Sequence, residues 1–224
     1  MEKSRPFKIV LITNLYPPHA RGGAERVVEL IAQELSNQKH EVVVITTAPK
    51  ESQISNLKLK IYSIRPWNLF WYGDIDKQPL WKRVLWRLLD LYNISSARRV
   101  AKIFFKEHPD IVMTHNLVGM GYQIPQMLKR FRARHVHVIH DVQLVVPSGK
   151  LWFDQKIRWY YELYARVCRH LFGSPFVVVS PSQWLMDFYT SRGFFLHSEK
   201  IVLQNPISST VIASGAKQSL VVAT

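Results

Sequence analysis

Two adjacent glycines, Gly22 and Gly23, are the residues of this sequence best placed to bind an anion. They separate an apolar run, residues 7–14, from an amphipathic run, residues 24–36. The first N–H groups of a helix lack intrahelical partners, and the helix dipole adds partial positive charge at that end. Glycine lets the backbone bend sharply and lets a ligand approach closely, so the pair is suited to a diphosphate. A tight strand-to-helix turn without a ligand is typical of the same pattern.

Further polar side chains follow other apolar runs. In an open α/β sheet, ligands bind beyond the carboxyl ends of the strands. An imidazole there can bond a sugar hydroxyl and changes charge near neutral pH, and an adjacent carboxylate can hold loop N–H groups or bind substrate. Together such groups predict a polar ligand site along one edge. Its candidate residues are His115, Asn116, His140, Asp141 and Ser180, with Ser182 and Gln183 beside Ser180.

The sequence lacks the motifs of several other kinds of functional site. No set of histidine, cysteine and carboxylate residues has the spacing of a metal site, so we predict no protein-bound metal. The first apolar run is not followed by Gly-x-Gly-x-x-Gly, which argues against a nicotinamide dehydrogenase. There is no Gly-x-Ser-x-Gly nucleophile elbow. His135 and His137 alternate with valines, and we interpret them as structural.

Strand-like and helical patterns alternate along the chain and must position these residues. Strands separated by helices, with short turns, predict an α/β fold with a Rossmann-like, doubly wound parallel sheet. The predicted strands cover residues 7–13, 41–47, 57–64, 110–114, 135–140, 176–180 and 200–204. The predicted helices cover residues 24–36, 79–106 with a break near Asn93, 119–131, 155–172 and 182–191.

Composition limits the class of protein. The chain has 224 residues, is 47% hydrophobic and can fill a sizeable core. Its one cysteine, Cys168, excludes an internal disulfide, fits a reducing cytoplasm and is expected to pack inside a helix. We expect no signal peptide, because residues 1–6 run straight into a strand. No apolar stretch has the length of a membrane-spanning helix.

The net charge of +14 is concentrated in one segment. Between Lys77 and Lys106 there are eight Lys or Arg residues and one acid, Asp90, among Trp and Leu at helical spacing. This pattern is typical of an interfacial helix on an anionic membrane, and equally of a surface helix whose apolar stripe lies in the core. A nucleic-acid-binding protein is a third explanation, but no recognition motif supports it and we predict no nucleic-acid partner.

Several segments, in order and spacing, resemble the GT-B glycosyltransferases of family 4 over residues 6–208. The first strand, its Tyr-Pro-Pro turn and its Gly-Gly-Ala-Glu helix start are similar to the opening of that family. A His-Glu-Val strand, an Asp-hydrophobic-His segment and a His-Asp run ending in Pro follow. The matching segments are residues 8–14, 16–18, 22–28, 39–44, 110–116, 140–147, 179–184 and 202–207.

The resemblance implies transfer of a sugar from a nucleotide-sugar donor to a glycan or lipid-linked acceptor in envelope polysaccharide synthesis. It implies retention of anomeric configuration, no cofactor and no metal. Gly22 and Gly23 would face the donor diphosphate, and His140 would lie beside the transferred sugar as the catalytic-site residue. The remaining substrate-binding positions would be Glu25, His115, Asn116, Asp141 and Ser180. The resemblance also implies a cytoplasmic protein, peripheral at the inner face of the membrane.

One departure from the family is large. The resemblance implies an N-terminal, acceptor-side domain at residues 1–208, and we expect that the family's donor-binding second domain is absent. Residues 209–224 contain no aromatic and no acidic residue, and we expect an unstructured or aberrant tail. We interpret the chain as a truncated acceptor domain that is inactive alone and binds nucleotide sugar weakly. The alternative is an acceptor-binding subunit that pairs with a separate donor-binding chain.

Overall fold

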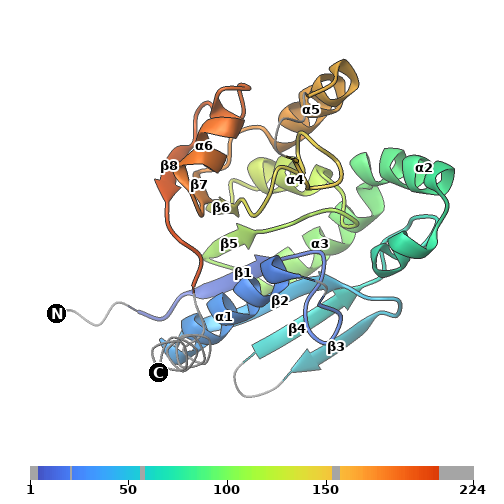
Figure 1. Ribbon diagram of the computed structural model, residues 1–224. Helices are drawn as coiled ribbons and strands as arrows, with labels where there is room; N and C mark the ends of the chain where they lie inside the picture. The colour runs from blue at the N-terminus through green and yellow to red at the C-terminus, as the bar shows by residue number, and fades with distance from the viewer. Residues whose placement is uncertain (1–4, 21, 56–58, 153–156, 207–224) are drawn as a thin grey trace, which may run out of the picture.

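The computed structural model describes residues 5–20, 22–55, 59–152 and 157–206, and a single sheet runs through these residues (Figure 1). Its strands are β1 (Lys8–Ile12), β2 (Glu41–Thr47), β3 (Ser52–Ser55), β4 (Leu59–Ile64), β5 (Ile111–Thr114), β6 (His135–Val138), β7 (Val177–Ser180) and β8 (Glu199–Val202). Their order is β3-β4-β2-β1-β5-β6-β7-β8. All neighbours pair in parallel except β3 and β4.

Strand β1 is central because both of its faces are apolar. Ile9 and Leu11 belong to one hydrophobic cluster, and Val10 and Ile12 belong to the other. A strand buried on both faces is typical of a covered parallel sheet, in which crossover helices lie on each side. The alternation of side chains along a strand therefore places the two clusters on opposite faces.

The helices divide between these two faces. Helix α1 (Gly23–Asn37) packs Val28 and Ala32 against the Ile9 side. On the other side lie α3 (Ile94–Glu107), α4 (Gln123–Arg130) and α5 (Trp159–Phe172), which contribute Val100, Leu128 and Cys168 to the larger cluster. Helix α6 (Gln183–Thr190) packs near β7 and β8. The predicted doubly wound α/β fold is confirmed, as is the buried helical position of Cys168.

Some elements differ from the sequence prediction. Strand β3 was not predicted, because its four residues are exposed, three of them are polar, and its pairing with β4 is an edge contact. A short 3-10 helix, η1 (Tyr72–Lys77), lies between the predicted strand at residues 57–64 and the predicted helix at residues 79–106. The basic segment does break near Asn93, whose side chain accepts a hydrogen bond from the Ser96 N–H at 3.1 Å and begins α3. The predicted tail, residues 209–224, lies outside the described residues.

The apolar stripe of α2 (Leu80–Leu91) is largely outside the core. Trp86 and Leu91 are buried, but Trp81 is 65% exposed and Leu88 is 58% exposed. The interpretation that this stripe packs in the core is therefore wrong for most of α2, although α3 does pack inward. Within the described part of the chain, no helix has both the length and the apolar character needed to cross a membrane.

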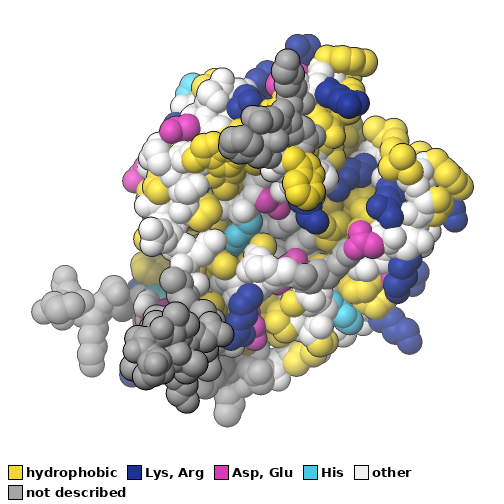
Figure 2. All heavy atoms as spheres, viewed as in Figure 1, with side chains coloured by type: hydrophobic (Ala, Val, Ile, Leu, Met, Phe, Trp, Pro, Cys, Tyr) yellow, Lys and Arg dark blue, Asp and Glu magenta, His cyan; other side chains and the backbone are white. Residues whose placement is uncertain are grey.

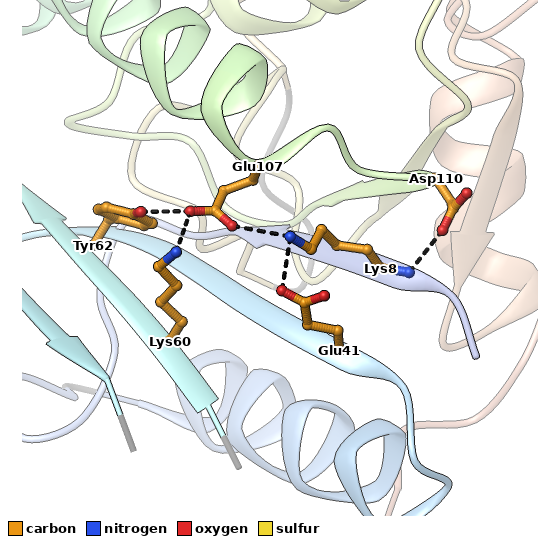
Figure 3. Close-up of polar contacts among 6 residues, drawn as sticks. All are labelled: Lys8, Glu41, Lys60, Tyr62, Glu107 and Asp110. Atoms are coloured by element: carbon orange, nitrogen blue, oxygen red, sulfur yellow. Dashed lines mark hydrogen bonds and ion pairs between the residues drawn. The ribbon is translucent and has the colours of Figure 1, made fainter. Parts of the chain in front are cut away.

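At the amino ends of the strands, an ion-pair network ties four segments together (Figure 3). Lys8 Nζ lies 2.7 Å from Glu41 and 3.2 Å from Glu107. Glu107, at the end of α3, also accepts hydrogen bonds from Lys60 Nζ and the Tyr62 hydroxyl. The network joins β1, β2 and β4 to α3, at the end of the sheet opposite to the predicted site.

Candidate functional site

A cleft of about 1220 Å³ opens at the carboxyl ends of the central strands. Strands β2, β4 and β3 lie on one side of β1, whereas β5 and the later strands lie on its other side, so the strand order reverses between β1 and β5. Open α/β sheets bind ligands at such a switch point. Figure 2 shows this face, with histidine and acidic side chains inside the hollow and basic side chains around it. The walls come from the start of α1, from α2, from the loops after β5 and β6, and from α5.

Six of the eight predicted site residues line this one cleft. They come from three separate segments, the loops after β1, β5 and β6, as the topology rule requires. His115 lies beneath the cleft and contacts it through His140. The six are Gly22, Gly23, Glu25, Asn116, His140 and Asp141.

Ser180 occupies a different environment. It is fully buried, and its Oγ donates a hydrogen bond to the Ser182 carbonyl at 2.8 Å, in the turn that leads into α6. Ser182 caps α6 by accepting the Leu185 N–H at 3.3 Å. The structure therefore uses this serine pair to connect β7 to α6.

The start of α1 carries a buried acid. The Gly22 N–H donates to Glu25 Oε2 at 2.8 Å, and Glu25 is buried. A Cβ on Gly22 would lie 3.4 Å from that oxygen, whereas a Cβ on Gly23 would meet nothing within 4 Å. An acid in the first turn stabilises the helix by the same dipole that attracts anions. The Glu25 carboxylate thus already accepts the hydrogen bond of one N–H group that was predicted to bind diphosphate. The side of the turn with free space is at Gly23.

His140 forms a neutral pair with His115. His115 Nδ1 and His140 Nε2 lie 3.0 Å apart, with stacked rings. Burial lowers the pKa of His140 to about 4. Burial, and then the neighbouring His140, lower the pKa of His115 well below its ordinary value. Both imidazoles are therefore neutral near pH 7, so one donates and the other accepts.

The outer nitrogens of this pair are buried without a hydrogen-bond partner in the part of the chain that the structure describes. Among the described residues, neither His115 Nε2 nor His140 Nδ1 has a hydrogen-bond partner, although both are buried. Both rings line a small cavity of about 20 Å³, and His140 also lines the cleft. His135 and His137 differ, because each ring bonds Thr114 Oγ1, at 2.6 and 2.9 Å. Their predicted structural role agrees with these contacts.

Asp141 holds the loop that follows β6. Its Oδ1 accepts the Gln143 N–H at 2.7 Å, and its carbonyl accepts the Tyr189 hydroxyl at 2.8 Å. Burial raises the pKa of Asp141 to about 6, although the Gln143 N–H and the charge of Arg87 oppose this shift. Gly149 has a φ of +72°, and a Cβ there would lie 3.2 Å from Asp141 Oδ2. The loop therefore closes tightly over the carboxylate.

Sequence reasoning missed the residues that α2, α5 and the chain's later turns bring to the cleft. Arg87 shares a face of α2 with Leu80 and Val84, and its charge favours the ionised form of Asp141. Helical spacing could have placed Arg87 on that face, but not opposite Asp141. The additional cleft residues include Arg83, Arg87, Lys150, Tyr161, Tyr164 and Asn205. Within the described ranges, no group of three or more His, Cys, Asp or Glu side chains could hold a metal ion.

The structure is similar to solved glycosyltransferases. The trehalose-6-phosphate synthase OtsA superposes with a TM-score of 0.58 and 13% identity, over 92% of this chain and 51% of OtsA. A trehalose-6-phosphate structure from E. coli, bound with UDP-2-fluoro glucose, superposes with a TM-score of 0.50 and 10% identity, over 92% of this chain and 50% of that chain. The chain thus corresponds in fold to about half of a GT-B glycosyltransferase.

Sequence comparison agrees with the fold. An uncharacterized 42.6 kDa protein in the cps region of Klebsiella pneumoniae is 29% identical over 212 residues, which are 92% of this chain and 57% of that protein. The chain therefore spans little more than half the length of this curated relative. The sequence profile of Glycosyltransferase Family 4 matches residues 21–207. The match covers most of the chain, which therefore belongs to Glycosyltransferase Family 4.

Proposed function

We propose that this chain is the acceptor-side domain of an enzyme that transfers a sugar from a nucleotide sugar to a glycan or lipid-linked acceptor in capsule or envelope polysaccharide synthesis. The observation that carries the proposal is the single cleft, in which residues from three strand-end loops meet. The cps-region relative supports the polysaccharide assignment. The bound UDP-2-fluoro glucose of the structural neighbour supports a uridine nucleotide sugar as donor.

The donor diphosphate would lie at the open side of the α1 turn. Gly23 leaves room there, and Arg87 and Lys150 line the same cleft. Fixed positive groups and N–H donors stabilise the charge that develops on a departing diphosphate, because they need no reorganisation during the reaction. Glu25 already engages the Gly22 N–H, so its role in the proposal is to fix the turn.

His140 would contact the transferred sugar as a neutral hydrogen-bonding group. Its lowered pKa excludes a standing imidazolium near pH 7. His115 would act as a positioning residue, because its hydrogen bond holds the His140 ring in place. Asn116 and Asp141 would bind hydroxyl groups at the cleft wall, and the transfer would retain anomeric configuration, as the family resemblance implies.

The donor-binding part of the enzyme would be supplied from outside residues 1–208. The chain spans 57% of its Klebsiella relative, which is consistent with a second domain or a separate donor-binding chain. On this proposal residues 1–208 bind UDP-sugar only weakly, because they would form only the acceptor-side half of the cleft. We also propose a cytoplasmic location at the inner membrane face, where lipid-linked acceptors are accessible.

Titration of the ¹⁵N-labelled chain with UDP-glucose tests this assignment. We expect chemical-shift changes at Gly22, Gly23 and His140, with a Kd of roughly 1 mM or weaker. Arg87→Gln should weaken binding several-fold, to about tenfold, because it removes a charge-assisted contact. Arg130→Gln, an exposed change on α4, is the matched control and should leave the Kd unchanged. Saturable shifts confined to residues outside the cleft would overturn the donor-facing role of the α1 turn.

A further inference from the structure

Helices α2 and α5 carry an unusual number of exposed aromatic and apolar side chains. Trp81 is 65% exposed and Trp159 is 78% exposed. Figure 2 shows hydrophobic side chains gathered over the two helices that flank the hollow, with Lys and Arg among them. We call these residues the α2/α5 surface. They are Leu80, Trp81, Val84, Leu85 and Leu88 on α2, and Trp152, Trp159, Tyr160 and Leu163 on and before α5.

The α2/α5 surface is organised around the mouth of the cleft. On α2, Trp81, Leu85 and Leu88 recur at spacings of three and four residues, which places them on one face of the helix. On α5, Trp159 and Leu163 are likewise four residues apart. Both helices also line the same cleft, α2 through Leu80, Val84 and Leu88 and α5 through its tyrosines. The apolar side chains thus border the opening from two sides.

The charge of α2 indicates which kind of partner could bind to its exposed side. The helix contains Lys82, Arg83 and Arg87, and its single acid, Asp90, is buried. Lys82 Nζ lies over the Trp81 ring, 5.5 Å from its centroid. Within α2 itself, the exposed side is therefore apolar and cationic, and Arg83 Nη2 also donates a hydrogen bond to the Asp76 carbonyl at 2.8 Å. Basic residues beside Trp and Leu on an amphipathic helix are typical of binding to an anionic lipid surface.

Tryptophan is the aromatic residue best suited to that boundary. Its ring is apolar and its indole N–H needs a polar partner, so it concentrates where hydrocarbon meets water. Trp86 shows the contrasting case within α2, because it is buried and donates its Nε1–H to the Phe70 carbonyl at 2.7 Å. Of the two tryptophans of α2, Trp86 is therefore buried in the core and Trp81 is exposed.

We propose that the α2/α5 surface docks on an anionic lipid bilayer, with the cleft opening at the level of the headgroups. Trp81, Leu85 and Leu88 would enter the interface from α2, and Trp159 and Leu163 from α5. Lys82 would contact lipid phosphates. The consequence for catalysis rests on the proposed function: a lipid-linked acceptor could reach His140 without leaving the membrane. The docking itself does not depend on sugar transfer.

Flotation with phospholipid vesicles tests the docking. The 224-residue chain should float with vesicles that contain phosphatidylglycerol and remain at the bottom with pure phosphatidylcholine. Binding should weaken as salt rises from about 0.1 M to about 1 M, because the Debye length shortens from about 10 Å to about 3 Å. Equal flotation with both lipids would overturn the role of charge, and no flotation at low salt would overturn the proposal.

Paired substitutions locate the contact. Trp81→Ser with Leu85→Ser, and separately Trp159→Ser with Leu163→Ser, should each weaken vesicle binding at least about tenfold, since each removes large apolar side chains from the interface. Trp184→Ser is the matched control, because Trp184 is 60% exposed but lies on α6, stacked on Phe188. An equal loss in the control variant, or no loss in either pair, would contradict the assigned surface.

Two further measurements keep the test decisive if one of the paired variants misfolds. Vesicles with brominated acyl chains should quench part of the tryptophan fluorescence of the unmutated chain, and should quench a larger fraction in Trp184→Ser, which removes a tryptophan outside the interface. Sedimentation equilibrium should show a monomer. A dimer that the Trp81→Ser, Leu85→Ser variant dissociates would show that a second copy of the chain covers this surface, and would overturn the lipid assignment. UDP-glucose binding in the cleft is scored separately, so failure of docking and failure of the proposed function remain distinguishable.

Discussion

The two ends of the parallel sheet differ in how completely their buried ionisable groups are hydrogen-bonded. At the amino end, Glu107 lies between Lys8 and Lys60 and accepts a third hydrogen bond from Tyr62 (Figure 3). At the carboxyl end, Asp90 has one oxygen bonded to the Gly119 N–H at 2.7 Å and the other without a partner among the described residues. The outer nitrogens of the His115–His140 pair likewise have no hydrogen-bond partner among the described residues.

The pKa values of the two acids differ with both the number of hydrogen-bond donors and the depth of burial. Burial alone would raise the pKa of Glu107, but the hydrogen bonds from Lys60, Tyr62 and Lys8 outweigh it and lower the pKa to about 2. Burial raises the pKa of Asp90 to about 7, because the Gly119 N–H and the charge of Arg87 offset only part of the cost. The amino end is arranged for stability. The carboxyl end keeps unfilled bonding capacity, which is what a ligand site requires.

Removal of the Glu107 charge should have the largest effect. Glu107→Gln keeps the side-chain size but leaves Lys8 and Lys60 without their shared carboxylate. We expect the free energy of unfolding at neutral pH to fall by about 2–3 kcal/mol, at or just below the lower limit for breaking a fully buried pair, since both lysines are partly exposed. Urea denaturation measures the change. Glu41→Gln is the control, and because that carboxylate is exposed it should cost less than about 1 kcal/mol.

The pH dependence of this difference has a definite sign. The folded pKa of Glu107, about 2, lies below its ordinary 4.5, so ionised Glu107 stabilises the native state above pH 4.5. That contribution is lost as the pH falls from 4.5 toward about 2. The gap between the unmutated chain and Glu107→Gln should therefore narrow over this window. A gap that stays constant with pH would show that the carboxylate is not responsible.

Asp90→Asn should have a smaller effect, in the opposite direction. The folded pKa of about 7 lies above the ordinary 3.8, so the native state loses stability as the pH rises through this window and the buried carboxyl ionises. Asparagine can still accept the Gly119 N–H but never ionises. We expect the variant to be more stable by about 1–2 kcal/mol at about pH 8, and not at acidic pH. Asp187→Asn, an exposed change on α6, is the control, and destabilisation by Asp90→Asn at both pH values would contradict the prediction.

The sequence was sufficient to predict the framework and the strand-end residues of the cleft. The apolar run of β1 and the amphipathic period of α1 are local signals, and the parallel topology then brings strand ends to one edge. This is why Gly23, Asn116 and His140, far apart in the chain, could be assigned to one site before their contacts were known. Ser180 also lies at the carboxyl end of a strand, but its hydroxyl donates a hydrogen bond to the Ser182 carbonyl.

What could not be predicted depends on contacts between distant segments. The stripe of α2 is equally compatible with burial and exposure, because amphipathic spacing does not say what covers the helix. Arg87 lies near Asp141 only because α2 and the loop after β6 meet across the cleft. The Glu25 bond to Gly22 was within reach of sequence reasoning, since an acid at the third position of a helix is a known partner of the N-terminal N–H groups.

The smallest expected effect concerns the histidine pair, and it tests the comparison most directly. His115→Leu or His140→Leu alone leaves the remaining ring nitrogen buried without its partner, and each should lower the free energy of unfolding by about 1–2 kcal/mol. The double variant removes both polar groups together, so its loss should be smaller than the sum by about 1 kcal/mol, measured as the coupling energy of a urea-denaturation cycle. A coupling energy of zero would mean that the pair contributes nothing to folding through its hydrogen bond.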